Sequence, residues 1–306
     1  MNRRDFLKHQ AQGVLTLAAG STGLLVPKRG LASEKPDIAV VEGASSAAAR
    51  TAVQLLGGMG SIVKKGDRVL IKPNMSFARG PEYATNTHPN VVREIVFMCK
   101  EAGAAKVLVL DNPLASAKRC LERSGIYEAC KDIDDCLVSM VTSSRQYEEV
   151  NIPKGKDMTK TDVMKEALKS DVLIAAPVAK SHSASGVSLS LKGMMGLILK
   201  RRLMHWRYNL DTSIVDLCTL LKADLTIIDA SRVLSTGGPG GPGKILRENK
   251  IIASKDMVAA DACAVSLFKW YGRHFKPRQV SHIQQAHERG LGRMDVERLV
   301  IKSISL

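Results

Sequence analysis

Short apolar runs alternate with helical segments along most of the chain, and this alternation constrains the fold more than any other feature. Runs such as 106–111 and 171–177 are almost continuously apolar, as is typical of strands buried on both faces of a parallel sheet. We therefore predict an α/β fold with a mostly parallel or mixed sheet and helices on both faces, in Rossmann-like layers. The predicted strands are 38–41, 68–72, 106–111, 171–177, 225–229, 250–254 and 299–304, and the predicted helices are 45–56, 89–102, 161–169, 212–222, 257–271 and 278–289.

Residues 33–306 are expected to form a single α/β domain, or two lobes that divide near 142–160, where the sequence is polar and rich in lysine. Hydrophobic residues make up 45% of the chain and charged residues 25%, which is the balance of a folded protein. The net charge of +15 favours anionic ligands or acidic partners. Nucleic acid does not fit, because aromatic residues are only 4% and none interleave with a basic stretch.

Residues 1–32 are predicted to be a twin-arginine signal peptide. Arg3 and Arg4 begin a motif that resembles this export signal, an apolar segment follows at 13–26, and small residues precede a cleavage site after Ala32. The resemblance implies export in the folded state to a periplasmic or extracytoplasmic location, often with a cofactor. The apolar segment is too short for a membrane span, so no transmembrane anchor is expected after cleavage. The alternative is a basic helix whose arginines are accidental.

The six cysteines do not form a closely spaced pair of the Cys-x-x-Cys type. Iron–sulfur clusters and zinc sites usually draw on such pairs, so the spacing argues against an intrinsic iron–sulfur cluster, and the cofactor stays unknown. Three cysteines lie in apolar helical segments and are expected in the core. The other three, Cys120, Cys130 and Cys136, are close in sequence and could be either disulfide-bonded or free.

Polar residues follow the predicted strands, where open α/β sheets bind ligands. Lys72 and Asn74 follow one strand, Lys180 and His182 follow another, and Asp229 ends a third. We predict that these residues gather at one edge of the sheet. Lys72, Asn74 and Asp229 are candidates for ligand binding, while Lys180 and His182 are candidates for catalysis.

The segment 180–193 combines hydroxyl groups, lysines and a predicted helix start, a combination that favours an anion. Lys192 is a further candidate for gripping phosphate or carboxylate. His182 could act as an acid or base, or as a metal ligand, or it could be structural. A weaker reading pairs His182 with His205 in a metal site, but the spacing carries no metal signature, so no metal ligand is assigned.

The glycine-rich stretch 237–243 could bring backbone N–H groups close to a ligand, so Gly237 and Gly238 are candidate binding residues. It does not match a P-loop, and a flexible surface turn is the alternative. The basic stretch 200–202 is expected to be a solvated face or a partner surface. Asp256, at the start of the helix beginning at 257, is expected to serve the helix dipole.

Several short motifs run in order over nearly all of 33–306: 71–74, 84–89, 101–107, 180–182, 188–196, 237–239, 253–256 and 290–292. Together they resemble the family of domain of unknown function 362, whose biochemical role is largely undefined. Some members of that family look like iron–sulfur proteins because they carry an added ferredoxin-type segment, and this chain lacks those cysteines. The chain also resembles, more weakly, the family of lactate racemase and the nickel-pincer cofactor. This resemblance lies only in the general arrangement, a segment with lysine and histidine between α/β lobes.

The leading hypothesis is an exported protein that binds an anionic or nucleotide-like ligand or cofactor at the strand ends and is linked to redox metabolism. Whether it is an enzyme stays open. The alternative is a non-catalytic accessory or assembly factor for an exported redox complex, docked through its basic surface. The expected partners are therefore an anionic small molecule and an exported redox protein.

Overall fold

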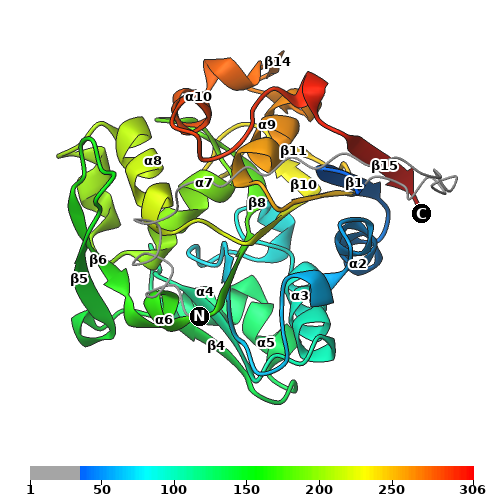
Figure 1. The fold of residues 1–306 in the computed structure, drawn as a ribbon, viewed down its shortest axis with the longest axis horizontal. Helices are drawn as coiled ribbons and strands as arrows, with labels where there is room; N and C mark the ends of the chain where they lie inside the picture. The colour runs from blue at the N-terminus through cyan, green and yellow to red at the C-terminus, as the bar shows by residue number, and fades with distance from the viewer. Residues whose placement is uncertain (1–34) are drawn as a thin grey trace, which may run out of the picture.

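The computed structural model describes residues 35–306, and the predicted signal peptide at 1–32 lies outside this range. The described part has the predicted α/β architecture, with one large mixed sheet between layers of helices (Figure 1). The strands are β1 Ile38–Glu42, β2 Arg68–Pro73, β3 Lys106–Asp111, β4 Cys136–Met140, β5 Tyr147–Asn151, β6 Lys160–Met164, β7 Val172–Ala176, β8 Val178–His182, β9 Gly186–Ser188, β10 Leu225–Leu234, β11 Ile245–Leu246, β12 Lys250–Ser254, β13 Lys269–Trp270, β14 Arg273–His274 and β15 Ile301–Ser305.

The helices lie between these strands. The α-helices are α2 Ser45–Leu55, α3 Pro89–Glu101, α4 Ala117–Ser124, α5 Ile126–Cys130, α6 Lys165–Lys169, α7 Ser190–Gly193, α8 Leu210–Leu220, α9 Met257–Leu267 and α10 Ser281–Glu288. Short 3₁₀ turns are η1 Met59–Ser61, η2 Pro81–Tyr83, η3 Ser144–Gln146, η4 Met194–Leu197, η5 Arg201–His205, η6 Pro277–Gln279 and η7 Val296–Arg298.

The main path of the large sheet runs β15-β1-β12-β10-β7-β2-β3-β4. The pairs from β10 through β4 are parallel, whereas β12 pairs antiparallel with both of its neighbours. Parallel strands present their carboxyl ends at the same edge, so the residues that follow β2, β3 and β7 come together there. β8 continues directly from β7, pairs with β10 and carries the chain beyond that edge.

Two hydrophobic cores lie on the two faces of the sheet, because successive side chains of a strand point to opposite faces. Leu70 and Leu108 belong to the core that α8, α9 and α10 cover. Val69 and Val107, each one residue earlier, belong to the core that α2 and α3 cover. In Figure 1 these two groups of helices lie on opposite sides of the strands. The prediction of helices on both faces is therefore confirmed.

The polar stretch near 142–160 contains η3 and the first strand of a separate hairpin, in which β5 and β6 pair antiparallel. The prediction of a helix over 161–169 is wrong for its first half, because residues 160–164 form β6, and only Lys165–Lys169 is helical. The division of 33–306 into one domain or two lobes stays a prediction.

The remaining local predictions are mostly confirmed. Asp256 caps α9, with its carboxylate accepting from the N–H groups of Val258 and Ala259. The helix over 257–271 is shorter than predicted, because the chain becomes extended from Phe268. The three cysteines expected in the core are buried, and all six are free. Among residues 35–306, no helix is long and apolar enough to cross a bilayer.

Candidate functional site

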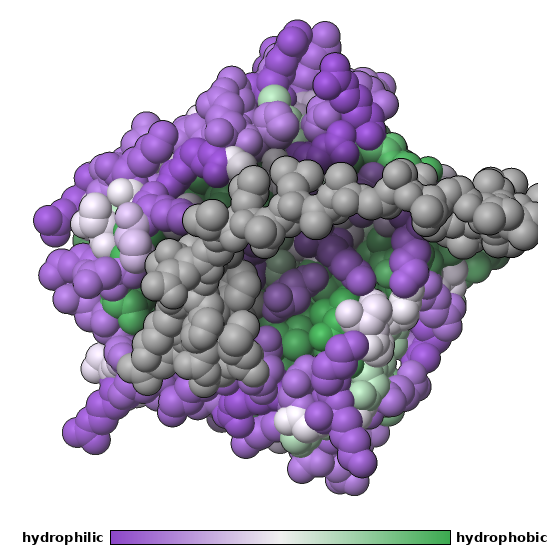
Figure 2. All heavy atoms as spheres, viewed as in Figure 1, coloured by the Kyte–Doolittle hydropathy of each residue, from purple (hydrophilic) through white to green (hydrophobic). Residues whose placement is uncertain are grey.

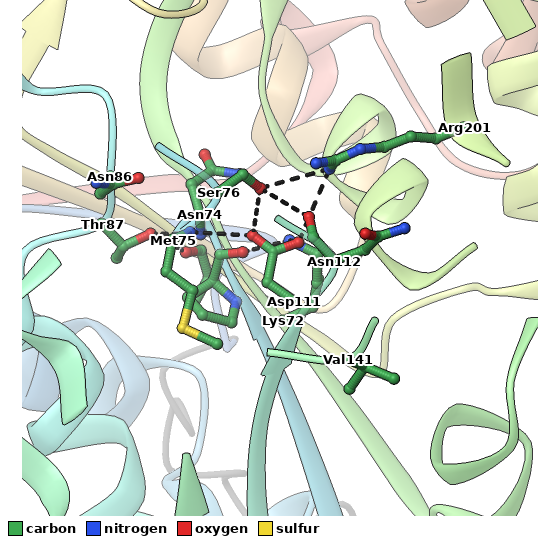
Figure 3. Close-up of polar contacts among 12 residues, drawn as sticks. Lys72, Asn74, Met75, Ser76, Asn86, Thr87, Asp111, Asn112, Val141 and Arg201 are labelled. Carbon is green, nitrogen blue, oxygen red and sulfur yellow. Dashed lines mark hydrogen bonds and ion pairs between the residues drawn. The ribbon is translucent and has the colours of Figure 1, made fainter. Parts of the chain in front are cut away.

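Lys72 and Asp111 form a buried ion pair where β2 and β3 end, with 3.2 Å between Nζ and Oδ1 (Figure 3). The other oxygen of Asp111, Oδ2, accepts hydrogen bonds from Met75 N at 3.0 Å and from Ser76 Oγ at 2.7 Å. Burial lowers the pKa of Lys72, and the carboxylate of Asp111 partly offsets this effect. Asp111 therefore both fixes the loop after β2 and neutralises one of the site's cations.

Arg201 lies at this ion pair, although the sequence placed it in a solvated basic stretch. Its side chain is only 12% exposed, and Nη1 lies 3.4 Å from Ser76 Oγ and 3.9 Å from Asp111 Oδ1 (Figure 3). Its Nη2 is buried and has no hydrogen-bond partner in the described chain. The expectation for 200–202 is thus wrong at Arg201, because η5 folds back over the strand edge and turns the guanidinium inward. The neighbouring Lys200 is exposed as expected.

Asn74 and Asp229 hold the edge of the sheet in shape. Asn74 Oδ1 accepts from Val178 N at 3.1 Å and so ties the loop after β2 to β8. Asp229 Oδ2 accepts from His88 N at 2.7 Å at the start of α3 and pairs with Arg232 at 2.9 Å. These oxygens already have internal partners, and a ligand-binding role for either residue stays a prediction.

Lys180 is fully buried on β8. Its ammonium donates to the carbonyl of Thr85 at 2.6 Å and lies 4.8 Å from the centre of the Phe77 ring. Its pKa is lowered to about 7: burial is the largest cause, Asp111 opposes it, and the nearby charges of Lys72, Arg201 and Lys192 act in the same direction as burial. Lys180 therefore lies within one electrostatic cluster with the three other basic groups.

His182 ends β8, and its ring is buried beneath that of His205. The two rings stack with centroids 5.7 Å apart and 20° between their planes. His182 Nδ1 accepts a hydrogen bond from Ala184 N at 3.1 Å. Burial, followed by the charges of Lys192 and His205, lowers the pKa of His182 to about 2. The ring is therefore neutral at physiological pH, with its proton on Nε2.

Lys192 lies on the short helix α7 and is almost completely buried. Its one hydrogen-bond partner within residues 35–306 is the thioether of Met195, at 3.2 Å. Burial lowers its pKa to about 7, the charge of Arg201 adds to this effect, and Asp211 opposes it. A thioether is a weak acceptor, so this ammonium lacks the anionic partner that a buried lysine normally has.

The glycine-rich loop at 237–243 packs against β8 and is not a free surface turn. Gly238 N donates to Ser181 Oγ at 3.0 Å, and a Cβ at Gly238 would overlap the carbonyl of Ser181. Gly237 has φ of +70°, and a Cβ there would overlap the carbonyl of Pro242. Both glycines are thus required by the packing of the loop, and their contact with a ligand stays a prediction.

The profile of the family described as "Domain of unknown function (DUF362)" matches residues 69–266, which is more than half of the chain. The chain belongs to the DUF362 family. A curated relative is the thylakoid-associated protein sll1697 of Synechocystis sp. (strain ATCC 27184 / PCC 6803 / Kazusa), which is 28% identical over 234 residues. That alignment covers 72% of this chain and 68% of the relative.

Two solved structures resemble this DUF362 chain distantly. The lactate racemase apoprotein from Thermoanaerobacterium thermosaccharolyticum aligns with a TM-score of 0.46 and 15% identity over 78% of this chain. A protein from Thermotoga maritima aligns with a TM-score of 0.36 and 12% identity over 61% of this chain. The chain spans 59% and 51% of these two structures. Similarities of this size carry no argument about activity.

The described part of this DUF362 chain therefore gathers four buried or nearly buried cations, of which Lys72 and Arg201 contact the buried carboxylate of Asp111. A cavity of about 290 Å³ lies against Arg201 and Asn112. Two larger hollows lie beside Gly43 and beside Arg79, and none of these three spaces is lined by a predicted site residue. Figure 2 shows hydrophilic residues over most of one face, with hydrophobic side chains visible mainly in recesses.

The sequence hypothesis of a metal site at His182 and His205 stays a prediction. No group of three or more His, Cys, Asp or Glu side chains is placed to hold a metal ion between residues 35 and 306. His182 and His205 do come together, as the weaker sequence hypothesis supposed, but they stack face to face. His182 also uses Nδ1 to accept a backbone hydrogen bond.

Proposed function

We propose that this DUF362 protein binds an anionic small molecule or cofactor, of phosphate-bearing or nucleotide-like chemistry, at the carboxyl edge of its sheet. One observation carries the proposal: Lys72, Lys180, Lys192 and the nearly buried Arg201 lie in one electrostatic cluster, in which Asp111 is the carboxylate that contacts Lys72 and Arg201. A bound anion would neutralise the excess charge.

The energetics support this proposal. Removing an ammonium from water without a counter-charge costs several kcal/mol, so a folded protein seldom gathers unpaired cations for stability alone. Titratable groups whose pKa values are shifted by burial and by specific neighbours are enriched at functional sites. Lys180 and Lys192 both fit this description, because the pKa of each is lowered to about 7.

The four cations and His182 would take different parts in holding the ligand. Arg201 offers an unsatisfied guanidinium nitrogen, and Lys192 offers an ammonium whose present acceptor is a thioether. His182 would act as a neutral hydrogen-bond donor through Nε2. Lys180 and His182 stay the candidates for proton transfer if the bound anion reacts.

Calorimetric titration with inorganic phosphate, pyrophosphate and adenosine monophosphate tests the proposal. We expect at least one of these anions to bind at 0.15 M salt and to raise the melting temperature, because a ligand that binds only the folded state stabilises it. Lys180→Met should weaken that binding at least about tenfold, which corresponds to one lost charge-assisted hydrogen bond. Lys118→Met, at an exposed lysine on α4, is the control and should leave affinity unchanged. Equal affinity of the Lys180 variant and wild type would overturn the proposal.

On the N-terminal motif alone, we further propose export through the twin-arginine route to the periplasm and a link to redox metabolism. The relative from Synechocystis is named as a thylakoid-associated protein. Changing Arg3 and Arg4 to lysine should retain the protein in the cytoplasm, as followed by cell fractionation. Unchanged export of this variant would contradict the route.

The second candidate function is a non-catalytic accessory factor that docks an exported redox protein. It is favoured by the surface around η5, where Trp206 is 87% exposed beside the exposed residues Leu203 and Arg202. A partner with an acidic rim would suit this basic and apolar surface. Co-purification of a redox protein that is lost with Trp206→Ala, while anion binding is kept, would favour this function. Retention of the partner by that variant would contradict it.

A further inference from the structure

A cavity of about 290 Å³ opens beside Arg201, and the proposed function gives it no role. Four apolar side chains line it: Pro113 and Leu114 from the segment after β3, Leu199 from the segment before η5, and Leu203 from η5 itself. Small-molecule sites start at about 300 Å³ and are mostly apolar, with a few polar groups that orient the ligand. The cavity therefore has the size and the lining for one compact organic group.

The cavity adjoins the ion pair of Lys72 and Asp111. Asn112, the residue after Asp111, lines the cavity. Arg201 lines it as well, and its Nη1 lies 3.9 Å from Asp111 Oδ1 and 3.4 Å from Ser76 Oγ (Figure 3). Lys72 Nζ lies 3.2 Å from the same carboxylate oxygen. Arg201 is thus shared by the ion pair and the cavity, so one ligand can contact this guanidinium with its anionic end and fill the cavity with the rest.

Hydrogen bonds hold the walls of the cavity in place. The side-chain Nδ2 of Asn112 donates to the carbonyls of Ile198 at 2.8 Å and Leu199 at 3.1 Å. Leu114 N donates to the carbonyl of Ser76, in the loop after β2, at 3.0 Å. A site whose walls are fixed before binding loses little conformational freedom when the ligand enters. These bonds therefore favour binding of a small molecule in the cavity.

The charges around the cavity favour an anionic ligand. Three basic side chains line it, Lys200, Arg201 and Arg202, and no carboxylate of the described chain does. Lys200 is paired with Asp162 at 3.4 Å, whereas Arg201 Nη2 is buried without a hydrogen-bond partner within residues 35–306. A guanidinium binds phosphate oxygens and also stacks on planar rings. An organic phosphate that carries a ring matches both properties.

We propose that this cavity holds the organic group of the ligand, and that the ligand is a phosphate ester with a compact apolar ring. The phosphate would contact Arg201 beside the ion pair, and the ring would lie against Leu114, Leu199 and Leu203. This inference rests on the proposed function and narrows its ligand from any phosphate-bearing anion to a ring-bearing organic phosphate.

Phenyl phosphate and methyl phosphate test the proposal. Both are monoesters with the same charged oxygens, and they differ in the organic group alone. We expect calorimetry to give at least about tenfold tighter binding of phenyl phosphate. A tenfold difference requires the burial of about 55 Å² of apolar surface at about 25 cal/mol per Å², which is less than a phenyl ring offers.

Variants of the cavity should change the ratio of the two affinities. Leu203→Ser should lower the preference for phenyl phosphate at least about threefold, because it removes an apolar wall. Leu114→Trp should lower it as well, because the larger side chain fills the space. Leu267→Ser is the matched control: Leu267 is 43% exposed, against 41% for Leu203, and lies outside the lining of the cavity. It should leave the ratio unchanged.

Methyl NMR of the wild type, labelled only at leucine, provides a test that needs no variant to fold. Phenyl phosphate should shift the methyl resonances of Leu114, Leu199 and Leu203 through the ring current of its phenyl group. Methyl phosphate has no ring and should shift them far less. The methyl resonances of Leu267 should move with neither ester.

The outcomes separate the two proposals. Equal affinity for the two esters, an unchanged ratio in both cavity variants, or binding of phenyl phosphate without the three leucine shifts would overturn the role of the cavity and leave anion binding intact. If neither ester binds, and inorganic phosphate, pyrophosphate and adenosine monophosphate fail to bind as well, the proposed function fails and this inference fails with it. Tighter binding of phenyl phosphate together with the leucine shifts supports both.

Discussion

Lys192 shows at the scale of a single residue what a buried charge costs the folded state. Its pKa is about 7 in the folded protein, against an ordinary value of 10.5. Below pH 7 the lysine is charged in both states, so the folded state bears the full cost of burying the charge. Between pH 7 and 10.5 the unfolded state binds more protons at Lys192 than the folded state does. The contribution of this lysine to the free energy of unfolding therefore rises with pH. Above that range the cost disappears.

Lys192→Met should therefore stabilise the ligand-free protein by about 1–3 kcal/mol at pH 6, since an unsatisfied buried polar group is replaced by an apolar chain. The gain should shrink steadily towards pH 10. Urea unfolding of wild type and variant at several pH values measures it, and anion affinity should fall in the same variant. Lys118→Met, at an exposed lysine, should be neutral throughout. A destabilised Lys192 variant at pH 6 would show that the lysine is structural.

His205 gives a second prediction at this scale. Its ring covers His182 and its charge lowers the pKa of that residue, after the larger effects of burial and of Lys192. His205→Ala should expose His182 to water and remove a neighbouring charge, so the pKa of His182 should rise from about 2. A pH titration of the His182 ring by NMR measures this change. An unmoved titration would mean that His205 does not shield His182.

Some site residues could be predicted from the sequence and others could not. Lys72 and Lys180 could be predicted from the sequence because each follows an apolar run. The carboxyl ends of parallel strands lie at the same edge of a sheet. Arg201 gave no such signal, since a run of three basic residues is most often solvated. Its burial depends on Asp111, some 90 residues earlier, and on the path of η5.

At the scale of elements, η4 brings the segment after α7 against the ion pair. Gly196 lies in this turn, and its carbonyl accepts from Asn112 N at 3.0 Å. A Cβ at Gly196 would overlap Lys72 Cε and Asp111 Oδ1. The absence of a side chain is therefore what lets η4 and the ends of β2 and β3 meet.

Gly196→Ala should destabilise the protein by about 1–3 kcal/mol, because the buried ion pair has to shift. Anion affinity should fall as well, since Lys72 is displaced. Gly60→Ala is the control: a Cβ there meets no atom within 4 Å. That substitution should change stability by less than about 0.5 kcal/mol. Thermal unfolding and phosphate titration measure the stability and the phosphate affinity of both variants. Equal values for the two variants would show that the turn accepts a Cβ at Gly196 without cost.

The one predicted element of the wrong type shows the limit of local pattern. Residues 161–169 have an acceptable helical spacing, yet Lys160–Met164 is a strand because it pairs with Tyr147–Asn151. Pairing with a strand 9 to 17 residues earlier in the chain outweighs a weak helical preference. The central strands were predictable because their apolar runs admit only a buried strand between turn signals.

At the scale of the whole molecule, the layers of sheet and helices follow from local sequence patterns. The balance of charges at the candidate site does not. The four cations lie at 72, 180, 192 and 201, and the fold brings them to one edge. Two of them, Lys180 and Lys192, have pKa values of about 7, so each is about half protonated at neutral pH without ligand. An anion bound among them favours the charged forms and raises both pKa values.

Anion binding should therefore take up protons, up to about one in total at pH 7, since each of two half-protonated lysines gains up to half a proton. At pH 5 both lysines are already charged and uptake from them should vanish, and above pH 8 affinity should fall with rising pH. Calorimetry with pyrophosphate in two buffers of different ionisation enthalpy measures the number of protons directly. Lys192→Met should halve the uptake, whereas Lys118→Met should preserve it. Heats independent of the buffer at pH 7 would mean that the lysines keep their protons without ligand, and that the cluster is neutralised within the folded chain.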